Sequence, residues 1–185
     1  MTIANALTPE QIHEQLAARV QGLSFVPAAP GVIPSTIVPA EQLIPVCQFL
    51  RDDPELRFDY PGSITAIDYL DYFEVVYQLR SFTHHHDVNL KCRTEREVAT
   101  LPSVVSIWPG ADFQEREIYD LFGITFTGHP NLKRILLWDE FEGYPLRKDF
   151  GIPAPMPAEV ELGLGRGTDL ASVEDVPVEG QETVP

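Results

Sequence analysis

Cysteine is scarce in this chain of 185 residues, which contains only Cys47 and Cys92. An iron–sulfur cluster held by a single chain needs about four thiolates. A finger-type zinc site needs cysteines or histidines paired at short spacing, and neither cysteine has such a partner. The sequence therefore excludes a cluster held by this chain alone and predicts two buried, reduced thiols.

Positive charge is also scarce. The chain has 13 Lys and Arg against 28 Asp and Glu, for a formal net charge of -15. Nucleic-acid binding depends on Lys and Arg displacing counterions from phosphates, and anionic lipid surfaces attract the same two residue types. We therefore expect neither nucleic acid nor a bare lipid surface as a partner.

Long apolar runs and the common catalytic motifs are missing. No window approaches the ~18 apolar residues of a membrane span, and the first residues lack the basic and apolar regions of a secretory signal. The glycine patterns of dinucleotide and nucleotide phosphate sites and the GxSxG elbow do not occur. We expect a protein of the cytoplasm or a similar compartment without a nucleotide site of its own.

The composition is that of a globular domain, with 44% hydrophobic and 22% charged residues. Thr8 and Pro9 are typical of a helix start, and apolar residues at every fourth position carry that helix toward Gly22. A strand is predicted over Val32–Val38, at a sheet edge because Pro34 cannot donate to a ladder. A second helix is predicted over Ala40–Asp52.

The middle of the chain changes to a strand pattern. Residues Ser63–Tyr69, Tyr72–Phe82 and Val88–Arg93 hold β-branched and aromatic residues in near alternation, which favours an antiparallel meander. The order of elements predicts an α+β fold, with two helices packed on a mixed or antiparallel sheet, followed by a short helical segment and an extended C-terminal arm.

Three regions are predicted along the chain. Residues 1–123 form the α+β domain, including a short helix over Leu101–Trp108 and a helix that Asp112 caps and Gly123 ends. Residues 124–150 form an extended interface arm, called the arm below. Residues 151–185 form an acidic tail that contains five prolines, with seven acidic residues and only Arg166 as a basic one. We expect this tail to be disordered or docked on a partner.

The run His84-His85-His86 lies between two predicted strands. Consecutive strand residues point to opposite faces, so three adjacent histidines do not converge on one ion unless the chain curls sharply. A solvated hairpin loop is therefore favoured over a metal site.

The densest group of ionisable residues lies in Gln114–Leu136. Glu115 and Glu117 are two apart on the predicted helix and face about 160° away from each other, so they form no catalytic dyad. A simple surface helix, with Arg116 and Asp120 paired at i,i+4, explains part of the segment. A protein–protein interface explains its apolar residues as well. An acid/base enzyme centred on His129 and Glu117 is a further hypothesis.

Three motifs carry a family resemblance: EREIYDLFGI, GHPNLKRIL and GYPLRKDF. Together they closely resemble the signature of the C subunit of NADH:quinone oxidoreductase, respiratory complex I, whose cyanobacterial and chloroplast counterpart is the J subunit. The upstream stretches ITAIDY, VVYQLRSF and LPSVVSIWPGADFQERE are similar to that family in the expected order, so the resemblance spans about residues 40–150. Phe113, Lys133 and Gly151 depart from the family, which commonly has Trp, Arg and Pro there.

The resemblance implies a peripheral-arm subunit that has no cofactor itself. FMN, iron–sulfur clusters and quinone would belong to partner subunits, chiefly the quinone-site D subunit and the iron–sulfur B and I subunits. The chain would lie on the cytoplasmic side of the cell membrane, or of a thylakoid, attached only through its partners. A scaffold subunit of a ferredoxin- or F420-linked dehydrogenase or of a membrane-bound hydrogenase is the alternative. The subunit interface that the resemblance implies consists of Glu115, Arg116, Glu117, Asp120, Gly123, His129, Pro130, Arg134, Pro145, Leu146, Arg147, Lys148 and Asp149.

Overall fold

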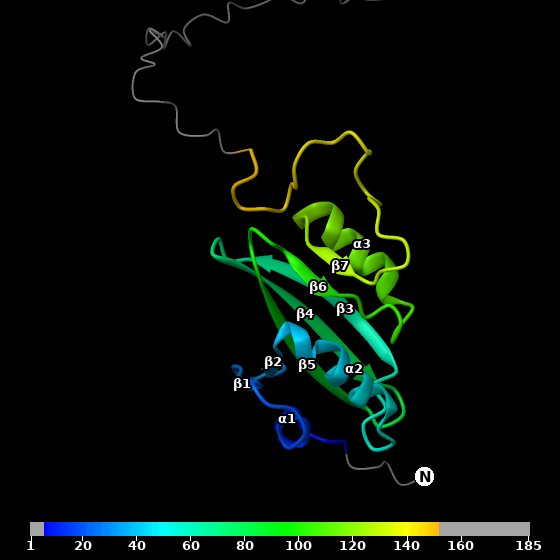
Figure 1. The fold of residues 1–185 in the computed structure, drawn as a ribbon. Coiled ribbons are helices and arrows are strands. Elements are labelled where there is room, and N and C mark those ends of the chain that lie inside the picture. The colour runs from blue at the N-terminus through cyan, green and yellow to red at the C-terminus, as the bar shows by residue number, and fades with distance from the viewer. Residues whose placement is uncertain (1–5, 152–185) are drawn as a thin grey trace, which may run out of the picture. The chain divides into compact units, whose positions relative to one another are not determined.

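The computed structural model describes residues 6–151 (Figure 1). Its helices are α1 (Pro9–Ala17), α2 (Leu43–Asp52), which follows a 3-10 turn at Ala40–Gln42, and α3 (Ala111–Phe122). Its strands are β1 (Ser24–Val26), β2 (Ser35–Ile37), β3 (Tyr60–Asp68), β4 (Tyr72–Ser81), β5 (His86–Glu95), β6 (Thr100–Pro102) and β7 (Thr125–Thr127). The predicted tail lies outside the described residues, apart from Gly151.

The main sheet has five strands in the order β1-β2-β5-β4-β3. β3, β4 and β5 form the predicted antiparallel meander, with Tyr77 opposite Ile64 on one side and opposite Leu90 on the other. β2 joins β5 in parallel, which makes the sheet mixed. β6 and β7 form a separate parallel pair.

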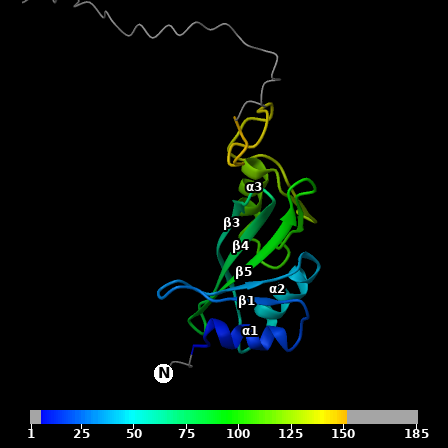
Figure 2. The same cartoon turned by 90° about the vertical axis from the view of Figure 1, so that its left-hand side faces the viewer.

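All three helices contribute to one core on a single face of the sheet. Alternate residues of β4 point to that face, and Phe73, Val75 and Tyr77 are fully buried there. Ile12 and Leu16 of α1 belong to the same core, as does the apolar stripe of α2. Figure 2 shows α3 and the arm toward one end of the sheet and α1 and α2 toward the other. The predicted α+β class is confirmed.

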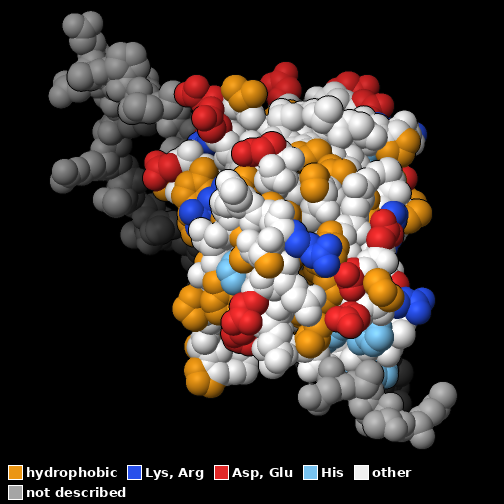
Figure 3. Space-filling view, turned by 60° about the horizontal axis from the view of Figure 1, so that its bottom comes forward, with side chains coloured by type: hydrophobic (Ala, Val, Ile, Leu, Met, Phe, Trp, Pro, Cys, Tyr) orange, Lys and Arg blue, Asp and Glu red, His pale blue; other side chains and the backbone are white. Residues whose placement is uncertain are grey.

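The opposite face of the sheet is polar and partly charged. Glu74 of β4 lies between Lys91 and Arg93 of β5, at 3.0 Å from Lys91 Nζ and 2.9 Å from Arg93 Nε. The three charges neutralise one another in part. Figure 3, which turns the bottom of Figure 1 forward, shows acidic side chains spread among uncharged ones rather than an extended basic surface.

The N-terminal helix begins where the sequence predicts and ends earlier. The Thr8 side chain accepts the Gln11 amide, and the Gln11 side chain accepts the Thr8 amide. The helix ends at Ala17, because the Leu16 carbonyl accepts both the Arg19 and the Val20 amides and the chain tightens into a turn. Gly22 has a φ of 83° in the following connection and does not end the helix.

Two predictions that concern strands are wrong. β2 is an inner strand, since the unpredicted three-residue strand β1 covers it on the outside. The helix predicted over Leu101–Trp108 is instead the strand β6 followed by a turn. Both errors involve strands of three residues, which hydrogen-bond to partners distant in sequence and therefore leave almost no local pattern.

The histidine run is less exposed than predicted. His86 is the first residue of β5, is buried, and has its Nε2 at 2.7 Å from the Leu56 carbonyl oxygen. The Nε2 atom of His84 lies 2.9 Å from the Pro54 carbonyl oxygen. Burial lowers the pKa of His86. Only the tip of the turn, at His85, fits the predicted solvated loop.

The two cysteines are buried and unbonded, as predicted. Cys47 lies on α2 and Cys92 on β5, both within the core. Burial raises the pKa of Cys92 to about 12 and raises that of Cys47 as well. Both side chains are therefore neutral thiols at physiological pH and pack as small apolar groups.

Candidate functional site: the arm and its carboxylate anchors

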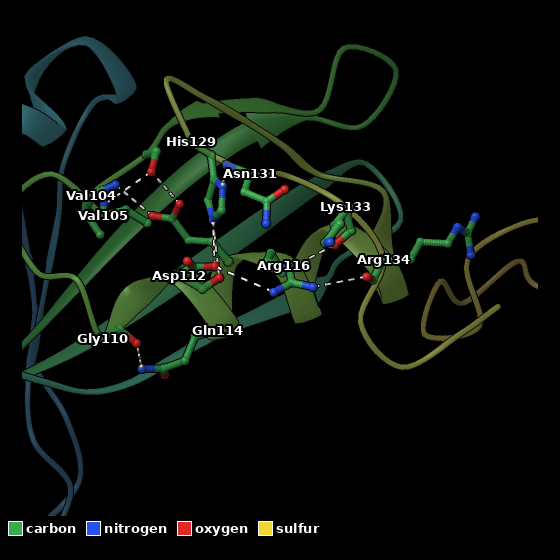
Figure 4. A network of polar contacts seen from close by, with 12 residues as sticks. Val104, Val105, Gly110, Asp112, Gln114, Arg116, His129, Asn131, Lys133 and Arg134 are labelled. Atoms are coloured by element: carbon green, nitrogen blue, oxygen red, sulfur yellow. Dashed lines mark hydrogen bonds and ion pairs between the residues drawn. The ribbon is translucent and has the colours of Figure 1, made fainter. Parts of the chain in front are cut away.

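Glu115 is fully buried in the first half of α3. Its carboxylate accepts hydrogen bonds from Ser103 Oγ at 2.6 Å and from the Val104 amide at 2.7 Å (Figure 4). Burial raises the pKa of Glu115 to about 7, although the two hydrogen bonds oppose the shift. Glu115 was predicted to lie at an interface, and Asp112 was predicted to cap the helix. In the structure Gly110 is the N-cap, and Glu115 joins α3 to the chain that leaves β6.

The raised pKa of Glu115 makes a pH-dependent stability prediction. The unfolded carboxyl titrates near 4.5 and the folded one near 7, so the native state binds the extra proton between these values. The contribution of this protonated carboxyl to the unfolding free energy is fully present below pH 4.5 and is lost as the pH rises through 7. Wild type loses this contribution as the pH rises, and Gln does not titrate. The unfolding free energy of Glu115→Gln minus that of wild type should therefore rise by roughly 2–3 kcal/mol between pH 4.5 and pH 7.5. Urea unfolding at a series of pH values measures this difference.

The exposed Glu117→Gln serves as the control, because it removes a carboxylate from the same helix without changing a buried group. Its unfolding free energy should follow that of wild type across the pH range. A constant difference between wild type and Glu115→Gln would show that the Glu115 carboxyl titrates at its ordinary pKa.

His129 connects the start of the arm to α3. Its ring is fully buried, with Nε2 at 3.3 Å from the Asp112 carbonyl oxygen, and Nδ1 accepts the Asn131 amide at 3.0 Å (Figure 4). With Nδ1 occupied as an acceptor, Nε2 is the nitrogen that donates. Both ring nitrogens are therefore used within the chain, and Glu117 is exposed to solvent on α3.

The acid/base hypothesis requires a closed pocket around His129 and Glu117. The best-formed open cavities on the described residues have volumes of about 260 to 510 Å³, and side chains other than His129 and Glu117 line them. Across residues 6–151, no group of three His, Cys, Asp or Glu side chains is placed to hold a metal ion. The geometry therefore does not favour this hypothesis.

Asp120 is the first anchor of the arm. Its Oδ2 accepts three consecutive amides, those of Ile135, Leu136 and Leu137, at 3.0, 2.8 and 2.9 Å. Its Oδ1 lies 3.3 Å from Arg134 Nη1. Burial alone would raise the pKa of Asp120, but the three amide donors and Arg134 outweigh burial and lower it. The carboxylate is ionised and holds a whole turn of the arm on α3.

Arg116 does not pair with Asp120 as the spacing predicts. Its guanidinium donates to the carbonyl oxygens of Lys133 and Arg134 at 3.2 and 3.3 Å (Figure 4), and its nearest carboxylate is Asp112 at 4.0 Å. The i,i+4 prediction is wrong because the arm returns alongside α3 and offers both residues stronger partners. Arg116 and Asp120 thus bind the same stretch of the arm from successive turns of one helix.

The second motif is anchored at the C-terminal end of α3. Arg147 Nε donates to the Phe122 carbonyl oxygen at 2.6 Å, and its guanidinium lies 4.6 Å from the Tyr144 ring centre and 5.1 Å from that of Phe73. The Leu146 amide donates to the Leu121 carbonyl oxygen. Arg147 therefore stabilises the C-terminal end of the helix with both its charge and its hydrogen bond.

Asp68 is the second anchor of the arm, and sequence reasoning missed it. It is buried at the end of β3, and its Oδ2 accepts the Lys148 amide and Arg96 Nη2, both at 2.9 Å. Arg96 also reaches Asp149 at 2.7 Å. Asp68 and Lys148 are 80 positions apart, so no local spacing could have joined them.

Gly123 allows the arm to approach α3. It caps the helix with a φ of 72°, as predicted. A Cβ atom there would lie 2.5 Å from Tyr144 Cζ and 2.7 Å from Arg147 Nη2. Only glycine both adopts this conformation without strain and leaves room for the second motif.

Ten of the thirteen predicted interface residues fall into two groups, and the other three, Gly123, His129 and Pro145, are partly buried. Glu115 and Asp120 are buried, and Arg116, Arg134 and Arg147 are bonded within the chain, so the geometry supports an intrachain role for these five. The exposed members are Glu117, Pro130, Leu146, Lys148 and Asp149. Contact with another subunit stays a prediction for the whole set.

The arm also exposes large apolar side chains that the sequence reasoning did not assign to the interface. Leu136 and Trp138 are 62% and 63% exposed, and Phe150 and Ile135 are also exposed. The sequence did contain a pattern that predicts this exposure, because apolar residues in a segment without helical or strand periodicity do not form one buried face. The arm thus directs Arg134 and Arg147 toward the domain and exposes large apolar groups, which is the pattern of a protein–protein interaction surface.

The fold and the site define a class of protein, namely an α+β domain that presents a carboxylate-anchored arm. The family model described as "Respiratory-chain NADH dehydrogenase, 30 Kd subunit" matches residues 36–156. The chain belongs to this family. The predicted resemblance to the C subunit of complex I is thereby confirmed.

Individual relatives agree with the family. The C subunit of NADH-quinone oxidoreductase from Roseiflexus sp. (strain RS-1) is 47% identical over 123 residues, covering 65% of this chain and 71% of the relative. The protein of the same description from Salinispora tropica is 48% identical over 120 residues, covering 61% of this chain and 49% of the relative.

The fold is also similar to that of solved structures. The trypsin-resistant fragment of Nqo5 has a TM-score of 0.56 at 30% identity, covering 66% of this chain and 98% of the fragment. A chain of the membrane-bound sulfane sulfur reductase, an archaeal respiratory membrane complex, has a TM-score of 0.64 at 26% identity, covering 77% of this chain and 85% of that one. In the part of the chain that the structure describes, no helix has the length and apolarity to cross a membrane.

Proposed function

We propose that this chain is a peripheral-arm subunit of a proton-translocating NADH:quinone oxidoreductase. It would hold no cofactor itself and would position neighbouring subunits for electron transfer from NADH, through FMN and iron–sulfur clusters, to quinone. The Roseiflexus and Salinispora relatives carry the description of the C subunit of that enzyme. The observation that carries the proposal is the arm: the buried carboxylates of Asp120 and Asp68 hold it near its middle and near its C-terminal end, while its large apolar side chains remain exposed.

The expected partners are the quinone-site D subunit and the iron–sulfur B and I subunits. An ordered arm suits such a role, because a segment that is already fixed loses little further conformational entropy on binding. The chain would be peripheral, on the cytoplasmic side of the membrane, and attached through these subunits. A scaffold subunit in a related ferredoxin- or F420-linked dehydrogenase or membrane-bound hydrogenase is the second candidate. The similarity to a chain of the sulfane sulfur reductase complex favours it as the runner-up.

Affinity purification of the tagged chain from its native membrane tests the proposal. The D, B and I subunits should co-purify, and the complex should reduce quinone with NADH as donor. The tagged chain purified alone should show no turnover of NADH or quinone. A complex that accepts electrons from reduced ferredoxin or F420 and not from NADH would favour the second candidate. Recovery of the chain without any subunit of either machine would contradict both.

A further inference from the structure

The segment Trp138–Glu142, called the acidic loop here, spans the gap between the two anchored parts of the arm. Before it, Asp120 accepts the amides of residues 135–137. After it, residues 146–148 are held by the carbonyls of Leu121 and Phe122 and by the Asp68 carboxylate. The yellow loop beyond α3 in Figure 1 is this part of the chain. Both ends of the acidic loop are therefore fixed to the domain.

The acidic loop exposes an unusual combination of side chains. Trp138 is 63% exposed. Asp139, Glu140 and Glu142 are exposed or half-exposed as well, and none of them forms an ion pair with a described residue. No Lys or Arg occurs between residues 135 and 146. The acidic loop thus presents one large aromatic ring together with three exposed carboxylates.

The inner side of the acidic loop is packed. The rings of Trp138 and Phe141 meet edge to face at 4.9 Å, and Phe141 stacks on Phe150 at 5.9 Å. Arg134 lies 6.0 Å from the Phe141 ring centre. Gly143 has a φ of 89°, and a Cβ atom there would lie 2.9 Å from the Phe150 ring. The aromatic residues beneath Trp138 therefore support it from within the chain.

We propose that the acidic loop is a preformed recognition element that inserts Trp138 into an apolar pocket of a partner polypeptide whose rim carries Lys and Arg. This inference rests on the proposed function and adds which residues make the contact and the charge of the partner surface. A partly exposed Trp on a supported loop has the properties of an interface hot spot. The three exposed carboxylates beside it select a rim of opposite charge and disfavour an anionic lipid surface.

The test measures binding of the full-length chain to purified D, B and I subunits, each immobilised separately, at several salt concentrations. With the subunit that binds wild type most tightly, Trp138→Ala should weaken the equilibrium binding by about thirtyfold or more. The triple variant Asp139→Asn, Glu140→Gln, Glu142→Gln should lower the association rate at low salt by about tenfold and flatten its salt dependence. Circular dichroism of each variant confirms that the domain is folded.

Two matched controls separate the acidic loop from general effects of composition. Phe82→Ala removes an exposed aromatic ring from the β4–β5 turn. The triple variant Glu14→Gln, Glu41→Gln, Glu55→Gln removes three exposed charges away from the arm. Both should bind as wild type does, within about twofold.

The outcomes distinguish the two proposals. If wild type binds none of the three subunits, both proposals are overturned. If wild type binds and the acidic-loop variants bind equally well, the proposed function stands and the assignment of the acidic loop is overturned. The assignment also fails if Trp138→Ala abolishes self-association of the chain while leaving subunit binding unchanged, because the acidic loop would then join two copies.

Discussion

Asp120→Asn should release the arm from α3 while leaving the helix in place. The carboxylate is fully buried, accepts hydrogen bonds from three amides and pairs with the Arg134 guanidinium. The variant leaves Arg134 without its counter-charge and replaces one acceptor oxygen by a donor nitrogen. Breaking a buried pair of this kind costs about 2–4 kcal/mol of unfolding free energy. Hydrogen exchange should show the amides of Ile135, Leu136 and Leu137 exchanging about a hundredfold faster.

Amides within α3 should retain their protection in Asp120→Asn, because Asp120 contributes no side-chain bond to the helix itself. Glu117→Gln is the control, since Glu117 lies three residues earlier on the same helix and is exposed. Equal exchange of residues 135–137 in wild type and in Asp120→Asn would mean that the amides are protected by other contacts. The Asp120 anchor would then be unimportant in solution.

Gly123→Ala should displace the second motif and destabilise the chain by about 3 kcal/mol. The left-handed conformation costs an alanine about 1 kcal/mol, and the remainder comes from moving Tyr144 and Arg147 away from the new Cβ atom. Urea unfolding measures the total. Loss of the contact between Arg147 and the end of α3 should also raise exchange of the Leu146 amide.

Gly128→Ala provides a matched control for Gly123→Ala. Gly128 also has a positive φ, 84°, but a Cβ atom added there would have no neighbouring atom within 4 Å. This variant should therefore show the conformational cost alone, about 1 kcal/mol. Equal destabilisation by the two variants would indicate that the second motif does not pack against Gly123 in solution.

The opposite directions of the carboxyl pKa shifts explain how the site behaves with pH. Hydrogen bonds outweigh burial at Asp120 and Asp68 and lower their pKa, so their contribution is present at neutral pH and is lost in acid. Burial dominates at Glu115 and raises its pKa to about 7, so its contribution decreases as the pH rises. The arm should therefore loosen in acid, whereas the junction between β6 and α3 is weakest above neutral pH.

Local patterns in the sequence predicted the elements whose signals span several turns or strand pairs. The capping box at Thr8, the apolar stripe of α2, the alternating β3–β5 meander and the glycine stop at Gly123 are all confirmed. The short strands β1, β6 and β7, the inner position of β2 and the end of α1 were not predicted correctly, since they depend on partners distant in the chain. The charged segment Gln114–Leu136 was recognised, but the sequence did not predict which of its side chains face the domain and which face solvent.

The sequence by itself determined the family, the α+β class and the segments that matter, because composition, periodicity and long motifs are local properties of the chain. Only the tertiary structure decided that Glu115 and Asp120 face inward, that Asp68 holds Lys148, and that Trp138 faces solvent. The physical reason is that the charge and hydrogen-bonding capacity of a side chain are fixed by its type, whereas its partner is fixed by which distant segment the fold brings within about 3 Å.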